Sequence, residues 1–115
     1  MRSRVLIPLA IGLVALTGCK SRYIAASVRN ESADPVTLIE VDYPSASFGT
    51  DALAAGATFR YRFKIIGSGP TKISWTDVHH HDHTSSGPQL HEGQQGQLAI
   101  ALTPAGASWS AHLTQ

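Results

Sequence analysis

Cysteine is almost absent from this chain: Cys19 is the only one among 115 residues. A lone cysteine excludes an internal disulfide, so a small domain in this chain must be held together by its apolar core. Charged residues are also few, at 15% of the sequence, and nine Lys and Arg against eight Asp and Glu give a formal net charge of +1. A nucleic-acid-binding protein needs a strongly basic face. We therefore expect no nucleic-acid partner.

Long apolar runs are scarce, and the clearest one lies near the amino end. Residues 5–16 carry no charge and follow Arg2 and Arg4. The run is shorter than the roughly 20 apolar residues that a membrane-spanning helix needs. A short basic segment followed by such a run is typical of a secretory signal peptide.

The run ends in Leu16-Thr17-Gly18-Cys19, which resembles the lipobox of bacterial lipoproteins. The resemblance covers the first 19 residues only. It implies that residues 1–18 are removed as a signal peptide and that Cys19 carries the lipid. Residues 19–22 are then a short tether for a domain at 23–115, and the lipid holds the protein to a bacterial membrane. The resemblance thus implies the cell envelope, on the periplasmic side or at the outer membrane.

The rest of the chain alternates between strand-like segments and turn residues such as Gly, Pro, Asn and Asp. This spacing predicts an all-β fold, an antiparallel immunoglobulin-like β-sandwich of six or seven strands, with a small open β-barrel as the alternative. Segment 36–43 is apolar on both faces, which indicates a central strand or a bulge. The predicted strands are 23–29, 36–43, 58–66, 71–78, 97–103 and 108–113, with a short seventh piece near Ser47 inside a loop at 45–57.

The clearest strand is 58–66, because large apolar and basic residues alternate along it. The alternation predicts that Phe59, Tyr61, Phe63 and Ile65 face the core and that Arg60, Arg62 and Lys64 face water. These basic residues form a stripe that either keeps the strand soluble or docks an acidic partner or lipid headgroups. The turn at 67–70 predicts that 58–66 and 71–78 form a hairpin.

A histidine-rich segment follows, with His79-His80-His81-Asp82-His83 and then His91. If the strand from Thr71 continues through it, His79, His81 and His83 share one face. A chain reversal near residues 86–87 would then bring His91 beside them. Such a set suits Zn²⁺, Cu²⁺ or Ni²⁺, all of which accept neutral imidazole nitrogen. The alternative is a solvated loop that binds added metal only weakly.

No G-x-S-x-G motif accompanies the many serines, and we expect no catalytic residues and no enzymatic activity. The sequence therefore predicts a lipid-anchored, non-catalytic binding or structural module that serves an envelope protein partner. The alternative is a periplasmic transition-metal-binding lipoprotein that uses the segment from His79 to His91, with Zn²⁺, Cu²⁺ or Ni²⁺ as its cofactor.

Overall fold

The computed structural model describes residues 23–115, so the predicted signal peptide, Cys19 and the tether lie outside the described residues. Eight strands make up the described chain, and none of its residues is helical. Accordingly, residues 23–115 contain no helix with the length and apolar character needed to cross a membrane. The strands are β1 (Ile24–Asn30), β2 (Val36–Tyr43), β3 (Ala46–Leu53), β4 (Thr58–Phe63), β5 (Gly69–Thr76), β6 (Asp82–Leu90), β7 (Gln95–Thr103) and β8 (Gly106–Thr114).

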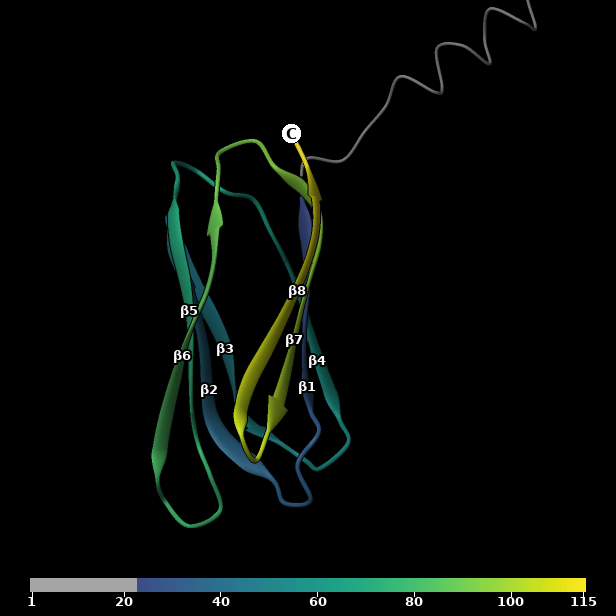
Figure 1. Ribbon diagram of the computed structural model, residues 1–115, viewed down its shortest axis with the longest axis vertical. Helices are drawn as coiled ribbons and strands as arrows, with labels where there is room; N and C mark the ends of the chain where they lie inside the picture. Colours follow the sequence, from purple (N-terminus) through teal and green to yellow (C-terminus); the bar gives the residue numbers. More distant parts are fainter. Residues whose placement is uncertain (1–22) are drawn as a thin grey trace, which may run out of the picture.

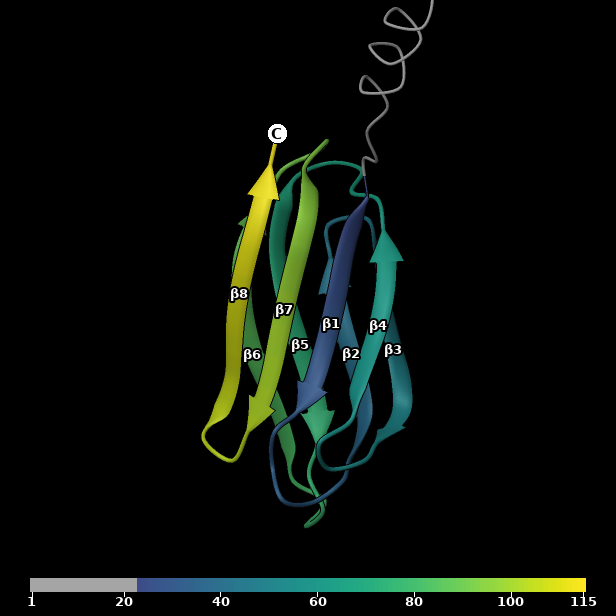
Figure 2. The same ribbon diagram turned by 90° about the vertical axis from the view of Figure 1, so that its right-hand side faces the viewer.

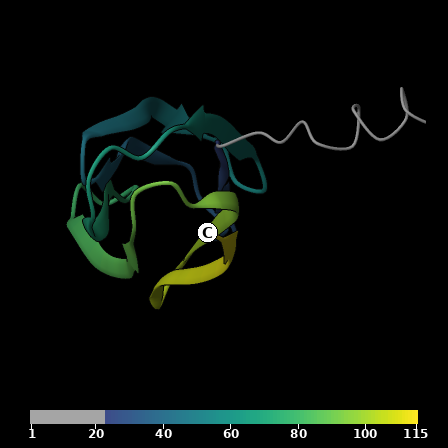
Figure 3. The ribbon, with the colours of Figure 1, turned by 90° about the horizontal axis from the view of Figure 1, so that it is seen from above.

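The strands form two four-stranded sheets, with orders β4-β1-β7-β8 and β3-β2-β5-β6. The sheets are stacked as two layers (Figure 1), and a quarter turn brings the β4-β1-β7-β8 sheet in front of the other (Figure 2). The view along the strands shows the two layers facing each other (Figure 3), and the core residues of both sheets form one cluster between them. This arrangement confirms the predicted β-sandwich, with eight strands in place of six or seven, and not the alternative barrel.

Two predictions about strand pairing are wrong. β1 pairs with β7 in parallel, although the spacing of strands and turns predicts an antiparallel sandwich. β4 and β5 lie in different sheets, so 58–66 and 71–78 do not form a hairpin. In both cases the partner comes from a distant part of the chain: β4 pairs with β1, and β1 with β7. Connection length therefore does not decide these pairs.

β3 contains the short seventh piece predicted near Ser47 and extends it to Leu53, whereas β6 occupies a segment for which the sequence predicts a loop or a chain reversal. β3 contains Ala, Gly and Asp, and β6 contains Asp, Gly and Pro, all of which have low strand propensity. Both are edge strands of one sheet, where β3 pairs with β2 and β6 with β5. Backbone hydrogen bonds to an apolar inner strand thus override the local composition.

The bulge interpretation of segment 36–43 is confirmed. The register of β2 against β5 shifts between Thr37 and Glu40, and Leu38 between them has a φ of 52°. The shift leaves Leu38 exposed and turns Ile39 and Val41 into the core. β2 is also an inner strand, so both features proposed for this segment occur together.

The core lies between the sheets and includes Phe63 and Ile65, as predicted, with Phe59 packed partly against it. Tyr61 does not point into the core and is 43% exposed. Because β4 is an edge strand, this side chain lies along the side of the sandwich, where its ring stacks on Phe48 of β3 with 4.5 Å between centroids. A buried apolar side chain contributes roughly 1.5–3 kcal/mol, and we assign Tyr61 a smaller share because of its exposure.

The strand directions divide the connections between two ends of the sandwich (Figure 1). Tyr23, the 64–68 and 91–94 connections and the carboxyl terminus lie at one end, which we call the Tyr23 end. The connections 31–35, 54–57, 77–81 and 104–105 lie at the other, which we call the far end. This division decides which predicted site residues can meet.

Candidate functional site

The histidine-rich segment forms the turn between β5 and β6 at the far end. Asp77 organises this turn, because its Oδ1 accepts hydrogen bonds from the backbone N–H groups of His79 (2.8 Å) and His81 (3.0 Å). The backbone N–H of Asp77 donates to the carbonyl oxygen of His81 at 2.9 Å. His80 takes a positive φ of 64° at the tip. The chain therefore reverses at 77–81, and the predicted reversal near residues 86–87 is wrong.

His83 is held by two contacts within this hairpin. It pairs with Trp75 across β5 and β6, and its ring stacks on the indole with 5.2 Å between centroids. Its Nε2 lies 2.7 Å from Oδ2 of Asp77. The hydrogen bond from His83, joined by the backbone bond from His81, lowers the pKa of Asp77 to about 2. His83 thus stabilises the turn that precedes it.

The structure does not bring His91 to the other three predicted metal ligands. His91 follows β6 at the Tyr23 end, whereas His79 and His81 lie in the far-end turn. At about 3.3 Å per strand residue, His83 and His91 are about 26 Å apart. His79 and His81 remain neighbours, with 6.4 Å between ring centroids. Within residues 23–115, no group of three or more His, Cys, Asp or Glu side chains is placed to hold a metal ion.

A cavity of about 260 Å³ opens beside the turn at the far end. Its lining includes the buried side chains of Val36, Trp75 and Leu102, with Asp77 and His83 among the polar residues. The carboxylate and the imidazole already bond to each other. The volume also falls below the roughly 300–1,000 Å³ usual for small-molecule sites. These features indicate a structural cluster at this end of the molecule.

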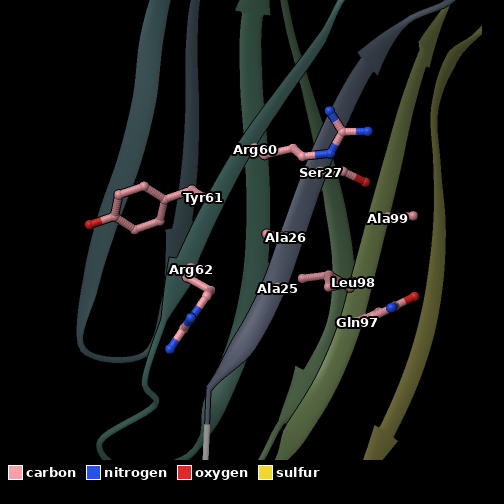
Figure 4. A pocket seen from close by; sticks show the side chains of 9 residues that line it. All are labelled: Ala25, Ala26, Ser27, Arg60, Tyr61, Arg62, Gln97, Leu98 and Ala99. Atoms are coloured by element: carbon pink, nitrogen blue, oxygen red, sulfur yellow. The ribbon is translucent and has the colours of Figure 1, made fainter. Parts of the chain in front are cut away.

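The outer face of the β4-β1-β7-β8 sheet has a different character. Strand register places its outward side chains in three rows: Arg62-Ala25-Gln97-His112, Arg60-Ser27-Ala99-Ser110 and Thr58-Arg29-Ala101-Ser108. We call these twelve positions the cationic face. A trough of about 570 Å³ runs over it, with small side chains on β1 and β7 beside the arginines on β4 (Figure 4).

The charge of the cationic face comes from Arg29, Arg60 and Arg62, and none of its twelve positions is acidic. Arg29 forms an ion pair with Glu31, just after β1, whose Oε2 lies 3.8 Å from Nε of Arg29. The guanidinium of Arg62 lies 4.4 Å from the ring centroid of Tyr23, a cation–π contact. The cationic face and its trough therefore present exposed guanidinium groups around a shallow surface of uncharged side chains.

The predicted docking stripe is therefore only part of this surface. Arg60 and Arg62 lie on it, whereas Lys64 follows the end of β4 at the Tyr23 end. Sequence reasoning missed Arg29, which joins the face because β1 pairs with β4. Because alternate residues of a strand point to the same face, the sequence could have shown that Arg29 lies on the same side as Ala25 and Ser27. It could not have shown that β4 is the neighbouring strand.

The outer face of the opposite sheet carries the opposite charge. Glu40 and Asp42 point outward from β2, and Asp82 lies on the same sheet in β6. The one outward basic residue among these paired positions is Lys72, whose Nζ lies 3.8 Å from Oδ2 of Asp42. Small side chains surround these charges. We define the acidic face by the outward positions Thr37, Glu40, Asp42, Ser47, Gly49, Lys72, Ser74, Thr76, Asp82, Thr84 and Ser86.

No protein-family model and no curated protein matches the chain. Solved structures that are similar to it include the following two. An NMR structure of a protein from Eubacterium rectale superposes with a TM-score of 0.57 at 11% identity, covering 78% of this chain and 88% of that one. A crystal structure described as a putative cell adhesion protein from Bacteroides uniformis ATCC 8492 gives a TM-score of 0.48 at 8% identity, covering 82% of this chain and 50% of that one. At such identities the first likeness shows the fold alone.

Proposed function

We propose that this chain is a lipid-anchored protein of a bacterial cell envelope and acts as a non-catalytic binding module. The lipobox at residues 16–19 supports the anchor. The observation that carries the binding role is the grouping of Arg29, Arg60 and Arg62 on a sheet face whose outward positions include no acidic residue. Guanidinium groups pair with carboxylates through planar, two-pronged hydrogen bonds. The module therefore takes a protein partner with an acidic surface.

An anchor at Cys19 also sets the orientation of the binding face. Cys19 precedes Tyr23 by four residues, which span at most about 14 Å when extended. A lipid at this position keeps the Tyr23 end close to the membrane, and the far-end turn at 77–81 points away from it. Both sheet faces run along the strands between these ends. A partner then approaches the cationic face from the side, parallel to the membrane surface.

The test measures binding of fluorescein-labelled poly-L-glutamate to the full-length protein in neutral detergent micelles at low salt. Combining Arg60→Glu with Arg62→Glu should weaken binding at least about tenfold, because two charge-assisted contacts become repulsive. Lys72→Glu on the acidic face is the matched control and should leave binding within about twofold, since it lies on the other sheet. Equal binding by the wild type and the double arginine variant would contradict the proposal.

A further inference from the structure

The two outer faces of the sandwich are complementary in charge. Among the outward strand positions, the cationic face carries Arg29, Arg60 and Arg62, a formal charge of +3, and Arg29 is paired with Glu31 just beyond the end of β1. The acidic face carries three carboxylates and Lys72, so its formal charge is −3 + 1 = −2. Arrangements of this kind attract opposite patches and disfavour contacts between like ones. A second copy of the chain therefore presents a surface that suits the cationic face.

From this we infer that the acidic face of one copy binds the cationic face of the next, so that copies stack side by side in the envelope. The inference rests on the proposed function, because it uses the same binding face and names its occupant.

Small side chains on both faces allow the sheets to approach closely. Between its arginines the cationic face presents Ala25, Ser27, Ala99, Ala101, Ser108 and Ser110. The acidic face presents Ser47, Gly49, Ser74, Thr84 and Ser86 around its charges. Sheets that pack face to face lie about 10 Å apart, a spacing that bulky side chains on both surfaces would increase. The long arginine side chains can then reach carboxylates across the contact.

The orientation of the copies follows from the charges and the anchor together. A two-fold dimer would bring a face against its own copy and place like charges together. Contact between unlike faces avoids this repulsion and leaves one free face of each kind at the ends of the stack. If the copies are related by translation, every Tyr23 end points in the same direction. Such a row satisfies an anchor at Cys19 in each copy.

The area of the contact indicates that stacking is weak in solution. Four strands about 4.8 Å apart, each about 23 Å long for seven residues, give roughly 440 Å² per face. A contact between two such faces buries roughly 900 Å² in total, below the 1,200–2,000 Å² of stable complexes. Confinement of the copies to one membrane raises their effective concentration and favours the contact. The measurement therefore belongs on membranes.

The test detects the contact between copies by cross-linking full-length protein in neutral phosphatidylcholine vesicles. One copy carries Ala99→Cys on the cationic face, and the other carries Ser74→Cys on the acidic face. A short bismaleimide should join the two in a mixture at least about fivefold more than it joins either alone, equivalent to about 1 kcal/mol. Protein without either substitution gives the background from any Cys19 whose sulfur carries no lipid.

Charge reversal then identifies the faces. Adding Arg60→Glu and Arg62→Glu to the Ala99→Cys copy should return cross-linking to background. Adding Glu40→Lys and Asp42→Lys to the Ser74→Cys copy should do the same. Mixing the two reversed copies restores opposite charges across the contact and should recover cross-linking, which also demonstrates that both variants are folded.

Other outcomes separate this inference from the proposed function. Absence of the mixed product with native charges would overturn the stacking of copies, and so would cross-linking that neither reversal changes. If poly-L-glutamate binding still depends on Arg60 and Arg62 in either case, the cationic face remains a binding surface whose partner is another acidic protein. Loss of both effects would overturn both proposals.

Discussion

Nε2 of His83 lies 2.7 Å from Oδ2 of Asp77, so the first residues of β6 are tied to the turn that precedes them. The same carboxylate accepts two backbone hydrogen bonds through its other oxygen. One side chain therefore holds both the loop and the adjoining strand. This relationship explains the segment with the most unusual composition in the chain as a stabilised hairpin turn.

Replacing the carboxylate should change how stability depends on pH. The folded-state pKa of Asp77 is lowered to about 2 from its ordinary value of 3.8. Its contribution to the free energy of unfolding is therefore complete above about pH 4 and is lost as the pH falls toward 2. In Asp77→Asn the free energy of unfolding should fall less steeply between pH 4 and 2 than in the wild type, measured by urea unfolding at several pH values.

The matched control for this measurement is Asp34→Asn, which removes one exposed carboxylate from another connection at the far end. A variant Asp77→Asn that loses stability with the same slope as the wild type would show that the carboxylate is not responsible for the acid limb.

Gly87 of β6 lies where the side of the sandwich closes against β8. A Cβ atom at this position would lie 2.4 Å from Oγ1 of Thr71 and 2.5 Å from Cζ3 of Trp109. The Trp109 indole also donates a hydrogen bond from Nε1 to Oγ of Ser85 at 3.1 Å, which limits its movement. Gly87→Ala should therefore lower the free energy of unfolding by about 1–3 kcal/mol, measured by urea denaturation.

Gly69→Ala is the control for that substitution, because its Cβ would make only an ordinary 3.4 Å contact with Pro44. Combining Gly87→Ala with Trp109→Phe removes the larger ring and should recover part of the lost stability. An unchanged denaturation midpoint in Gly87→Ala would contradict close packing of β6 on β8.

Zinc should bind weakly, and His91 should not contribute. His91 lies at the opposite end of β6 from His83, while Asp77 already bonds to His83. Calorimetric titration of the full-length protein with ZnCl₂ should give an affinity no tighter than about micromolar. His91→Ala should leave that affinity unchanged, whereas His81→Ala should weaken the zinc binding further. Tight binding that depends on His91 would show that the hairpin is arranged differently.

Membrane attachment should depend on Cys19. The lipobox predicts that its sulfur carries the lipid, and each buried methylene of an acyl chain contributes about 0.8 kcal/mol of membrane affinity. Cys19→Ser should move the protein from the membrane fraction to the soluble fraction, while the nearby control Ser21→Ala should not. Mass spectrometry of the native protein should show acyl chains on residue 19. An unmodified cysteine would contradict the anchor.

The amino-acid sequence by itself determined the strands that carry large apolar residues. In β4 the alternation identified Phe63 as core and Arg60 as outward, and both side chains lie as predicted. Such residues reveal their direction because successive strand side chains point to opposite faces. Tyr61 was the exception. The alternation placed it on the same side of the strand as Phe59 and Phe63, but it could not show that β4 is an edge strand, where this side chain stays exposed.

Only the tertiary structure decided which strands are neighbours, and with them the composition of each face. β3 and β6 are strands because inner strands supply their hydrogen-bond partners, not because their own residues favour extended structure. Arg29 joins Arg60 because β1 pairs with β4, and His91 is separated from His83 by the length of β6. A strand's residues set the direction of its side chains, whereas the surface they form depends on backbone hydrogen bonds to remote segments.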